Sequence, residues 1–324
     1  GLDVLDIPTV SSIAHEAGVP LLVDSTLTSP WLIKPFEHGA DLVYHSATKF
    51  LSGHGTVIGG VLVDGGSFDW EKSGRFPEMT QPYDGFHGMV FAEESTVGAF
   101  LLRARREGLR DFGACMSPHT AWLILQGIET LPLRMQQHMR NTEKLVQFLA
   151  DQPFVARVGH PLLPSHPSHA LAQKLLPRGA GSVFSFDIKG SRAQGKAFIE
   201  ALKLFSHLAN VGDCRSLVIH PASTTHHRLS NEALAAAGIG QGTIRLSIGL
   251  EDADDAGERP GDADGRHQHA DGERGGDAEA GNHGHHPGGA AILVALLLRC
   301  GADALADVIR QRLDGATQAL DDLA

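Results

Sequence analysis

The stretch ADLVYHSATKFLSGHGTVIGG, residues 40–60, decides how we interpret the fold. An apolar run ends in two hydroxyl residues and a lysine (Ser46, Thr48 and Lys49), and a glycine-rich segment follows. Lysine is normally a surface residue. A continuous apolar run of this kind is typical of a strand buried in a sheet. Lys49 is therefore predicted to lie just beyond the end of such a strand.

The neighbouring segments repeat one order of elements. Residues 5–18, LDIPTVSSIAHEAG, have a proline near the start, apolar residues at helical spacing and a glycine at the end, which predicts a helix. The apolar run VPLLVDST, residues 19–26, then predicts a strand buried on both faces. A helix is expected again over 30–40, and TVIGGVLVDGG, residues 56–66, is one more strand. Helix and strand alternate, which predicts an α/β fold with a mostly parallel sheet.

Two further parts follow along the chain. Residues 92–150 are predicted to be helical with a break near Gly127 and Pro132, and residues 151–250 return to strands and helices. We expect the following parts: 1–140, the C-terminal part of a large domain; 141–255, a smaller C-terminal α/β domain; 256–289, a disordered Gly/Asp/His-rich segment; and 290–324, a helical tail. The chain does not begin with methionine and has few strands for such a sheet, so we also expect that an N-terminal part is absent.

The net charge of −11 is concentrated near the C-terminus. Residues 251–288 hold 11 acidic and 3 basic residues, and residues 289–324 hold 5 and 3, which leaves a net charge of −1 for residues 1–250. The globular part thus lacks the basic surface that nucleic-acid binding needs. No apolar run approaches the roughly 18 residues needed to span a bilayer, so no membrane association is expected.

Cysteine and histidine spacing gives no metal site. Cys115, Cys214 and Cys300 lie far apart, which favours reduced thiols in a cytoplasmic protein. The C-terminal segment offers five histidines as rival metal ligands: His267, His269, His283, His285 and His286. Histidine binds Zn or Ni readily, but too few apolar residues surround these five to build a scaffold, so we predict solvated disorder and no metal. An out-of-frame reading of GC-rich DNA is an alternative origin for this segment.

Polar groups at two successive strand ends carry the candidate chemistry. In open α/β sheets ligands bind beyond the carboxyl ends of the strands. The first strand delivers Asp24, and the second delivers Ser46, Thr48 and Lys49. A lysine in a partly dry site has a lowered pKa and can form a Schiff base with an aldehyde, hydroxyls suit phosphate oxygens, and a carboxylate can pair with a protonated ring nitrogen. This set of groups fits pyridoxal phosphate. Taken alone, each residue also has a structural explanation: Lys49 could be a solvated surface lysine, and Asp24 could cap a helix.

Four segments resemble one enzyme family. They are VDST…ADLVYHSATKFLSGHGTVIGGVLVD, LRDFGACMSPHTAWLILQGIETLPLRMQQH, LKLFSHLANVGDCRSLVIHPASTTH and IRLSIGLEDADD. They are similar to the cysteine and methionine metabolism enzymes that use pyridoxal phosphate, a fold type I group related to cystathionine γ-synthase, and in particular to O-acetylhomoserine sulfhydrylases. The resemblance covers residues 1 to about 255. It implies part of a large, mostly parallel-sheet domain and a smaller C-terminal α/β domain.

The resemblance implies roles for the residues at the strand ends. Lys49 would bind the cofactor aldehyde and move protons between the substrate carbons and the cofactor. Asp24 would pair with the pyridine nitrogen, and Ser46 and Thr48 would hold the phosphate.

The resemblance also implies residues for the substrate. Arg245 would clamp the α-carboxylate with its planar fork, and strand alternation agrees, because Ile244 and Leu246 would face the other way. Ser216 would assist the same carboxylate, and Thr225 would support the site. For Arg245 and Thr225 alone, the alternatives are a solvent-facing strand residue and a loop hydroxyl bonded to backbone.

The reaction implied is γ-replacement on O-acetyl-L-homoserine. Acetate leaves from the γ-carbon, and sulfide or a small thiol adds to give homocysteine or methionine. Within the same class, cystathionine γ-synthase or γ-lyase and methionine γ-lyase are alternatives. An alternative of another class is a truncated, non-catalytic chain that cannot hold the cofactor. The expected partners are small-molecule substrates and, for a complete chain, further copies in a homo-oligomer, usually a homotetramer.

Overall fold

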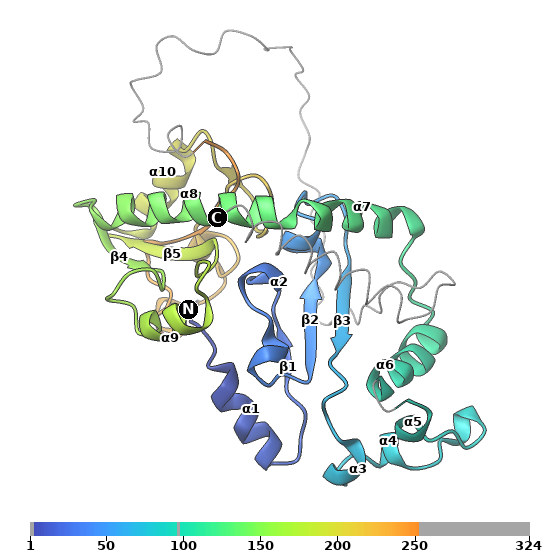
Figure 1. Cartoon of the computed structure of the whole chain (residues 1–324). Coiled ribbons are helices and arrows are strands. Elements are labelled where there is room, and N and C mark those ends of the chain that lie inside the picture. Colours follow the sequence, from blue (N-terminus) through green and yellow to red (C-terminus); the bar gives the residue numbers. More distant parts are fainter. Residues whose placement is uncertain (1–2, 96–97, 253–324) are drawn as a thin grey trace, which may run out of the picture.

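A computed structural model describes residues 3–95 and 98–252 of the chain. Within these residues two sheets are joined by a pair of consecutive helices, α7 and α8, which run across the molecule (Figure 1). α7 contacts the segment that follows the second strand, and α8 reaches the second sheet. No described helix is long and apolar enough to cross a membrane.

The first sheet has three strands in the order β1 (Leu22–Asp24), β2 (Leu42–Ser46) and β3 (Gly60–Asp64). β1 and β2 pair in parallel, as the alternation of helix and strand predicts, whereas β2 and β3 pair antiparallel. The third strand therefore departs from the expected mostly parallel sheet. Parallel pairing needs a crossover connection that is usually a helix, but residues 47–59 between β2 and β3 hold only the short turn at Ala47–Leu51, and the chain turns back antiparallel.

β1 is not buried on both faces, and that prediction is wrong. Val23 is buried at 6% exposure, but Leu22 is 46% exposed and Asp24 is also exposed. Leu22 and Asp24 share one face of β1, and the described residues leave that face exposed. An apolar run reports hydrophobicity, but it does not report which face finds a partner.

The helix predicted over residues 5–18 is α1 (Ile7–Glu16). The Asp6 side chain caps it by accepting a hydrogen bond from Thr9 N at 3.3 Å. The helix predicted over 30–40 is two short elements, α2 (Ser29–Leu32) and η1 (Pro35–His38). Proline disfavours helical angles at the residue before it, and Lys34 is accordingly extended at φ −108° and ψ 94°.

A group of short helices follows β3 and has an apolar cluster of its own. Its elements are α3 (Trp70–Ser73), α4 (Pro77–Thr80), η3 (Asp84–Phe86), α5 (Phe91–Glu94), α6 (Ala99–Arg103) and η4 (Ala104–Asp111). Met79, Phe91 and Ala99 form the buried centre of this cluster.

The predicted break in the long helix is confirmed. α7 (Pro118–Glu129) ends at Thr130, and α8 (Leu131–Ala150) begins directly after it. Pro132 lies in the first turn of α8, where the missing N–H has no helical partner to lose. Gly127 allows α7 to approach the backbone after β2 so closely that a Cβ atom would collide with carbonyl oxygens there.

The second sheet has five strands in the order β4-β5-β8-β7-β6. Their bounds are β4 (Val155–Gly159), β5 (Val183–Ile188), β6 (Ser206–His207), β7 (Leu217–Ile219) and β8 (Thr243–Ser247). The helices beside them are α9 (His169–Leu175), α10 (Arg192–Ala201), η5 (Pro221–Ser223) and α11 (Asn231–Ala236). The return to strands after residue 150 is thus confirmed. β8 is central and pairs antiparallel with β5 and β7.

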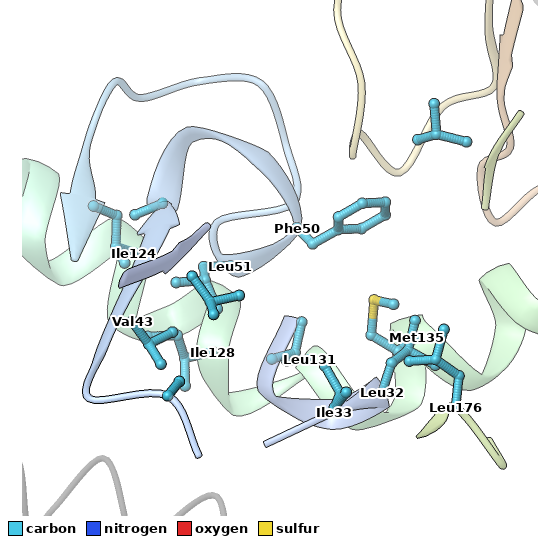
Figure 2. Close-up of a cluster of buried hydrophobic side chains, with 14 of the residues drawn as sticks. Leu32, Ile33, Val43, Phe50, Leu51, Ile124, Ile128, Leu131, Met135 and Leu176 are labelled. Atoms are coloured by element: carbon cyan, nitrogen blue, oxygen red, sulfur yellow. The ribbon is translucent and has the colours of Figure 1, made fainter. Parts of the chain in front are cut away.

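The segment after β2 is anchored in the larger core. Phe50 and Leu51 pack among apolar side chains from β2, α7 and α8, including Ile124 and Met135 (Figure 2). A second core lies between α8 and the five-stranded sheet. The backbone that carries Lys49 is therefore held by burial of the two residues that follow it.

Several predictions concern residues outside the described range. These are the disorder expected over 256–289, the helical tail expected over 290–324 and the five histidines of that region. The boundary predicted between residues 140 and 141 falls inside α8 and stays a prediction.

Candidate active site

A single wide helical turn, η2 (Ala47–Leu51), follows β2 and carries Lys49. Ser52 N donates to the Ala47 carbonyl oxygen at 3.0 Å and closes the turn, and Gly53 N donates to the Lys49 carbonyl oxygen at 2.8 Å. Phe50 and Leu51 enter the core, while the Lys49 side chain is half-buried and faces the second sheet. Lys49 itself has non-helical backbone angles, φ −90° and ψ −128°, so the turn is kinked at the residue that carries the amine.

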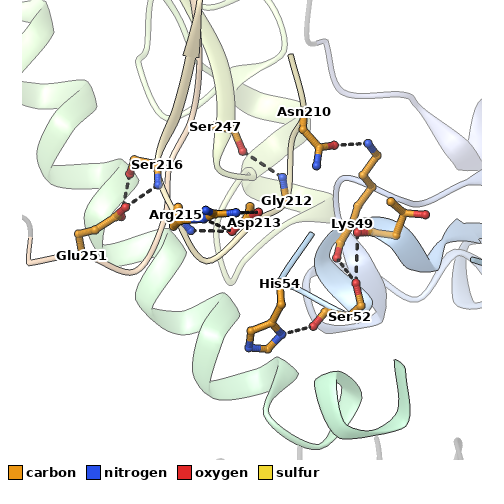
Figure 3. Close-up of polar contacts among 11 residues, drawn as sticks. Lys49, Ser52, His54, Asn210, Gly212, Asp213, Arg215, Ser216, Ser247 and Glu251 are labelled. Carbon is orange, nitrogen blue, oxygen red and sulfur yellow. Dashed lines mark hydrogen bonds and ion pairs between the residues drawn. The ribbon is translucent and has the colours of Figure 1, made fainter. Parts of the chain in front are cut away.

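The Lys49 amine meets an amide from the other part of the molecule. Its Nζ donates a hydrogen bond to Oδ1 of Asn210 (Figure 3). The pKa of Lys49 is lowered from its usual value, first because burial disfavours the charged form and second because the Arg245 guanidinium repels it. The amine is therefore more readily neutral, and so more nucleophilic, than a surface lysine.

Arg245 lies on β8 close to the same amide residue. Its Nη2 donates to the backbone carbonyl oxygen of Asn210 at 3.3 Å. Ile244 and Leu246 are buried in the second core, so Arg245 faces the other way, as strand alternation predicts. Burial lowers the pKa of Arg245 from its usual value, but a guanidinium stays charged.

The segment that carries Asn210 is pressed against the Lys49 turn. Gly212 N donates to Ser247 Oγ at 3.0 Å, and Cys214 N donates to the Gly53 carbonyl oxygen at 2.7 Å. Gly212 has φ +75°, and a Cβ atom there would lie 3.0 Å from Lys49 Cβ. Only glycine allows this approach without strain, so the contact between the two halves of the site depends on it.

Asp24 and Ser46 share the more exposed face of the first sheet. Asp24 is in register with Tyr44, two residues before Ser46, and side chains two apart point to the same face. Asp24 Oδ1 accepts a hydrogen bond from Thr26 N at 3.0 Å. Among the described residues, Asp24 Oδ2 and Ser46 Oγ have no hydrogen-bonding partner, so both are available to a ligand.

Thr48 has a different environment. Its Oγ1 accepts from Gly59 N at 3.0 Å and donates to the Gly59 carbonyl oxygen at 3.3 Å. The hydroxyl thus joins the Lys49 turn to the start of β3. To bind a phosphate it would have to give up the longer of these two bonds.

The structure does not bring Ser216 or Thr225 to Arg245. Ser216 Oγ donates to Glu251 Oε2 at 2.9 Å and accepts from Gly249 N at 2.8 Å, so this hydroxyl is occupied in the fold. Thr225 is exposed in the loop after η5 and bonds the ring of His226 at 2.8 Å.

Sequence reasoning missed Asn210. It lies six residues before Ser216 in the quoted segment LANVGDCRS, which has no periodicity that marks a site. The available signal was the Asn-x-Gly spacing before a buried strand, since Gly212 is the residue that permits close approach. Contact with both Lys49 and Arg245 arises only when the two sheets pack together.

Metal ligation has no support in the described part of the chain. No group of three or more histidine, cysteine, aspartate or glutamate side chains there could hold a metal ion. Cys115 and Cys214 are free thiols.

Comparison with known proteins gives one consistent result. A family model described as Cys/Met metabolism PLP-dependent enzyme matches residues 1–258. An O-acetyl-L-homoserine sulfhydrylase from Leptospira meyeri is 49% identical over 263 residues, which is 78% of this chain and 59% of that protein. A homocysteine synthase from Schizosaccharomyces pombe is 48% identical over 255 residues, with the same coverage. This chain therefore spans about 60% of the length of the relatives it matches.

A solved structure agrees with the sequence matches. It is described as an O-acetylhomoserine (thiol)-lyase from Campylobacter jejuni and carries N'-pyridoxyl-lysine-5'-monophosphate. The TM-score is 0.73 with 38% sequence identity, and the match covers 78% of this chain and 60% of that one. The expected fold type I architecture is thus confirmed for the matched part.

Proposed function

The chain belongs to the Cys/Met metabolism family of PLP-dependent enzymes, and we propose that it takes part in γ-replacement on O-acetyl-L-homoserine. Acetate would leave from the γ-carbon, and sulfide or a small thiol would take its place to give homocysteine or methionine. The names of the relatives support this reaction over the alternatives, which are those of cystathionine γ-synthase, cystathionine γ-lyase and methionine γ-lyase. The single observation that carries the proposal is the convergence of the Lys49 amine, the Asn210 amide and the Arg245 guanidinium.

The described residues fit pyridoxal phosphate by their chemistry. Lys49 offers an amine of lowered pKa to an aldehyde, and Ser46 Oγ is free to donate to a phosphate oxygen. Asp24 Oδ2 can accept from a ring nitrogen and keep it protonated. When bound, this cofactor would supply an electron-withdrawing ring that stabilises negative charge on the substrate α-carbon. Thr48 is a further phosphate donor in this proposal, once its bond to the Gly59 carbonyl is released.

The substrate's carboxylate is assigned to Arg245. Its planar guanidinium can donate two parallel hydrogen bonds to a carboxylate, and its half-buried position strengthens them. Asn210 lies between Arg245 and Lys49 and can donate its amide N–H to the same carboxylate. Ser216 would join these residues only if it left Glu251, so we place Asn210 ahead of Ser216 in this role. Thr225 stays a supporting candidate at the edge of the loop after η5.

Lys49 is also the proton carrier of the proposed site. The lowered pKa makes the neutral form of Nζ easier to reach than in a surface lysine, and a base needs this form in order to take a proton from the substrate α-carbon. Asn210 Oδ1 accepts from Nζ and holds it on the side of the site where Arg245 orients the substrate. A substrate whose carboxylate is bound by Arg245 would thus have its α-carbon close to the Lys49 amine, which acts as the base.

The test is cofactor attachment to the purified chain. We expect added pyridoxal phosphate to give a visible absorption band, and borohydride reduction to leave the label on the Lys49 peptide by mass spectrometry. Lys49→Ala should abolish band and label. Lys196→Ala is the matched control, since within the described part of the chain Lys196 forms an exposed ion pair with Glu200 and no other polar contact, and it should change neither. Homocysteine formation from O-acetylhomoserine and sulfide then tests the reaction itself. Label spread over surface lysines without enrichment at Lys49 would contradict the proposal and favour a non-catalytic chain.

Two coarser properties complete the proposal. We propose a cytoplasmic location, supported by the two free thiols, and assembly into a homo-oligomer, with a homotetramer as the expected state. Large apolar side chains on the surface, including Ile58 at 82% and Phe112 at 83% exposure, are candidates for such an interface, because burying them between copies is favourable. Light scattering coupled to size-exclusion chromatography measures the state directly, and a monomer at micromolar concentration would contradict assembly.

A further inference from the structure

One face of α8 contacts both halves of the proposed site. Arg134, His138 and Asn141 are spaced by four and three residues, so their side chains share one face of the helix. All three are buried, with exposures of 6%, 0% and 5%. A polar stripe that is buried in a helix is costly unless each member is hydrogen-bonded. The partners of these residues therefore show what the stripe does.

Arg134 holds the turn that carries Lys49. Its Nη1 donates to the Phe50 carbonyl oxygen at 2.8 Å, and its Nη2 donates to the carbonyl oxygens of Leu51 at 3.2 Å and Gly127 at 2.6 Å. Its Nε donates to Thr130 Oγ1 at 3.1 Å. Within residues 3–95 and 98–252 it forms no ion pair, so three backbone carbonyl oxygens and the Thr130 hydroxyl balance its charge. A lysine could not span these acceptors, because only the guanidinium offers donors in a fixed fork.

His138 joins the Lys49 turn to the end of β8. Its Nδ1 donates to the Ile248 carbonyl oxygen at 2.7 Å, and its ring meets the Phe50 ring edge-on at 5.3 Å between centroids. Burial lowers the pKa of His138 to about 4, so the ring is neutral at physiological pH and Nδ1 carries the proton. One turn further along, Asn141 Nδ2 donates to the Gly249 carbonyl oxygen at 3.0 Å.

The contacts of Arg134 and His138 lie next to Lys49 and Arg245 in the chain. Phe50 directly follows Lys49, and Ile248 lies three residues after Arg245. We propose that Arg134 and His138 are positioning residues that set the separation between the Lys49 amine and the Arg245 guanidinium. This role rests on the proposed function, because the separation decides whether one substrate molecule can contact both the Lys49 amine and the Arg245 guanidinium. The geometry itself does not depend on the cofactor.

The test measures the Lys49 amine without cofactor. Competitive labelling of the full chain with acetic anhydride over a pH series, read on the Lys49 peptide by mass spectrometry, gives the pKa of that amine. In the unchanged protein burial and Arg245 lower this pKa. In Arg134→Lys the turn loses its fork, and in His138→Leu the end of β8 loses its donor, so Lys49 moves away from Arg245 or towards water. We expect the labelling midpoint to rise by about 0.5 pH unit or more in both variants.

Matched variants separate positioning from general destabilisation. Thr142→Val removes a buried hydrogen bond from Thr142 Oγ1 to the His138 carbonyl oxygen, which is internal to α8, and it leaves the side-chain donors of Arg134 and His138 in place. It should lower the melting temperature but leave the Lys49 midpoint unchanged. His138→Asn keeps an N–H donor near the Nδ1 position and should restore the midpoint.

An unchanged midpoint in folded Arg134→Lys and His138→Leu overturns the inference, and so does an equal shift in Thr142→Val. If Arg134→Lys fails to fold, the His138 variants decide alone. Failure of the unchanged chain to attach pyridoxal phosphate counts against the proposed function only, since the labelling needs no cofactor.

Discussion

β1 and β8 each present one charged side chain to the proposed site, but in different surroundings. β1 is a three-residue edge strand among the described residues, and its Asp24 is exposed. β8 is a central strand between two antiparallel neighbours, and its Arg245 is half-buried against the Asn210 carbonyl. Arg245, which would bind the substrate carboxylate, is thus held in place by the fold. The side chain of Asp24, in contrast, faces water.

This difference teaches where the interaction energy lies. A charge that is surrounded by water contributes little to folding, whereas a half-buried charge in fixed geometry binds a counter-ion strongly. Substitution at β8 should therefore change binding strongly, and substitution at β1 should leave stability almost unchanged.

Arg245→Lys should have the largest effect on activity. Lysine keeps the charge but loses the bidentate fork, so we expect kcat/KM for O-acetylhomoserine to fall on the order of 100-fold, equivalent to about 3 kcal/mol. Steady-state kinetics measures this value. Arg157→Lys on β4 is the control, because Arg157 forms only an exposed ion pair with Asp187 and should leave kinetics unchanged. Equal kinetics for Arg245→Lys would show that Arg245 does not contact the substrate.

Acid should destabilise the fold through two buried histidines near the strand ends. Burial lowers the pKa of His45, on β2, and of His138, beside β8, from 6.5 to about 4. Between pH 6.5 and 4 the unfolded chain binds more protons than the folded one, so stability falls as the pH is lowered through this window. The loss is about 3 kcal/mol for each histidine.

Urea unfolding at several pH values measures that loss. His45→Asn and His138→Asn should each remove the part of the loss that its own histidine contributes, whereas substitution of the exposed His227 should not change it. A pH profile that is the same in both asparagine variants as in the unchanged chain would contradict this assignment.

Gly212→Ala should test the contact between the two halves of the site. The new Cβ would meet Lys49 Cβ at 3.0 Å and Phe50 N at 2.9 Å, in a backbone conformation at φ +75° that alanine disfavours. We expect a loss of about 2–3 kcal/mol in unfolding free energy. In Gly238→Ala, at φ +71° with nothing within 4 Å of the new atom, only the backbone cost of about 1 kcal/mol remains. Equal losses for the two variants would mean that the close approach contributes nothing.

Asp24→Asn should have the smallest effect on stability. The amide oxygen can still accept from Thr26 N, so we expect the unfolding free energy to change by no more than about 0.5 kcal/mol. Cofactor affinity should fall, because a neutral amide cannot keep a ring nitrogen protonated. Denaturation and a cofactor titration measure the two quantities. A change above about 1 kcal/mol in stability would show that Asp24 is a structural residue.

Most of the fold was predictable from local patterns. The helix at α1, the strand β2, the break between α7 and α8, and the return to strands after residue 150 follow from apolar spacing and from the positions of proline and glycine. The direction of β3 and the exposure of β1 were not predictable in this way. Pairing direction depends on how the short segment after β2 turns back, and burial depends on which elements lie against each face.

The candidate site divides along the same line. Sequence alone identified the family, the lysine at the end of β2 and the orientation of Arg245, because a strand end and a two-residue alternation are local properties. Tertiary structure alone decided that Asn210 meets Lys49, that Ser216 bonds Glu251 instead, and that Arg134 and His138 secure both halves. Lys49 and Asn210 are 161 positions apart, and His138 and Ile248 are 110 positions apart. Only close packing of the two sheets on α8 brings the members of each pair together.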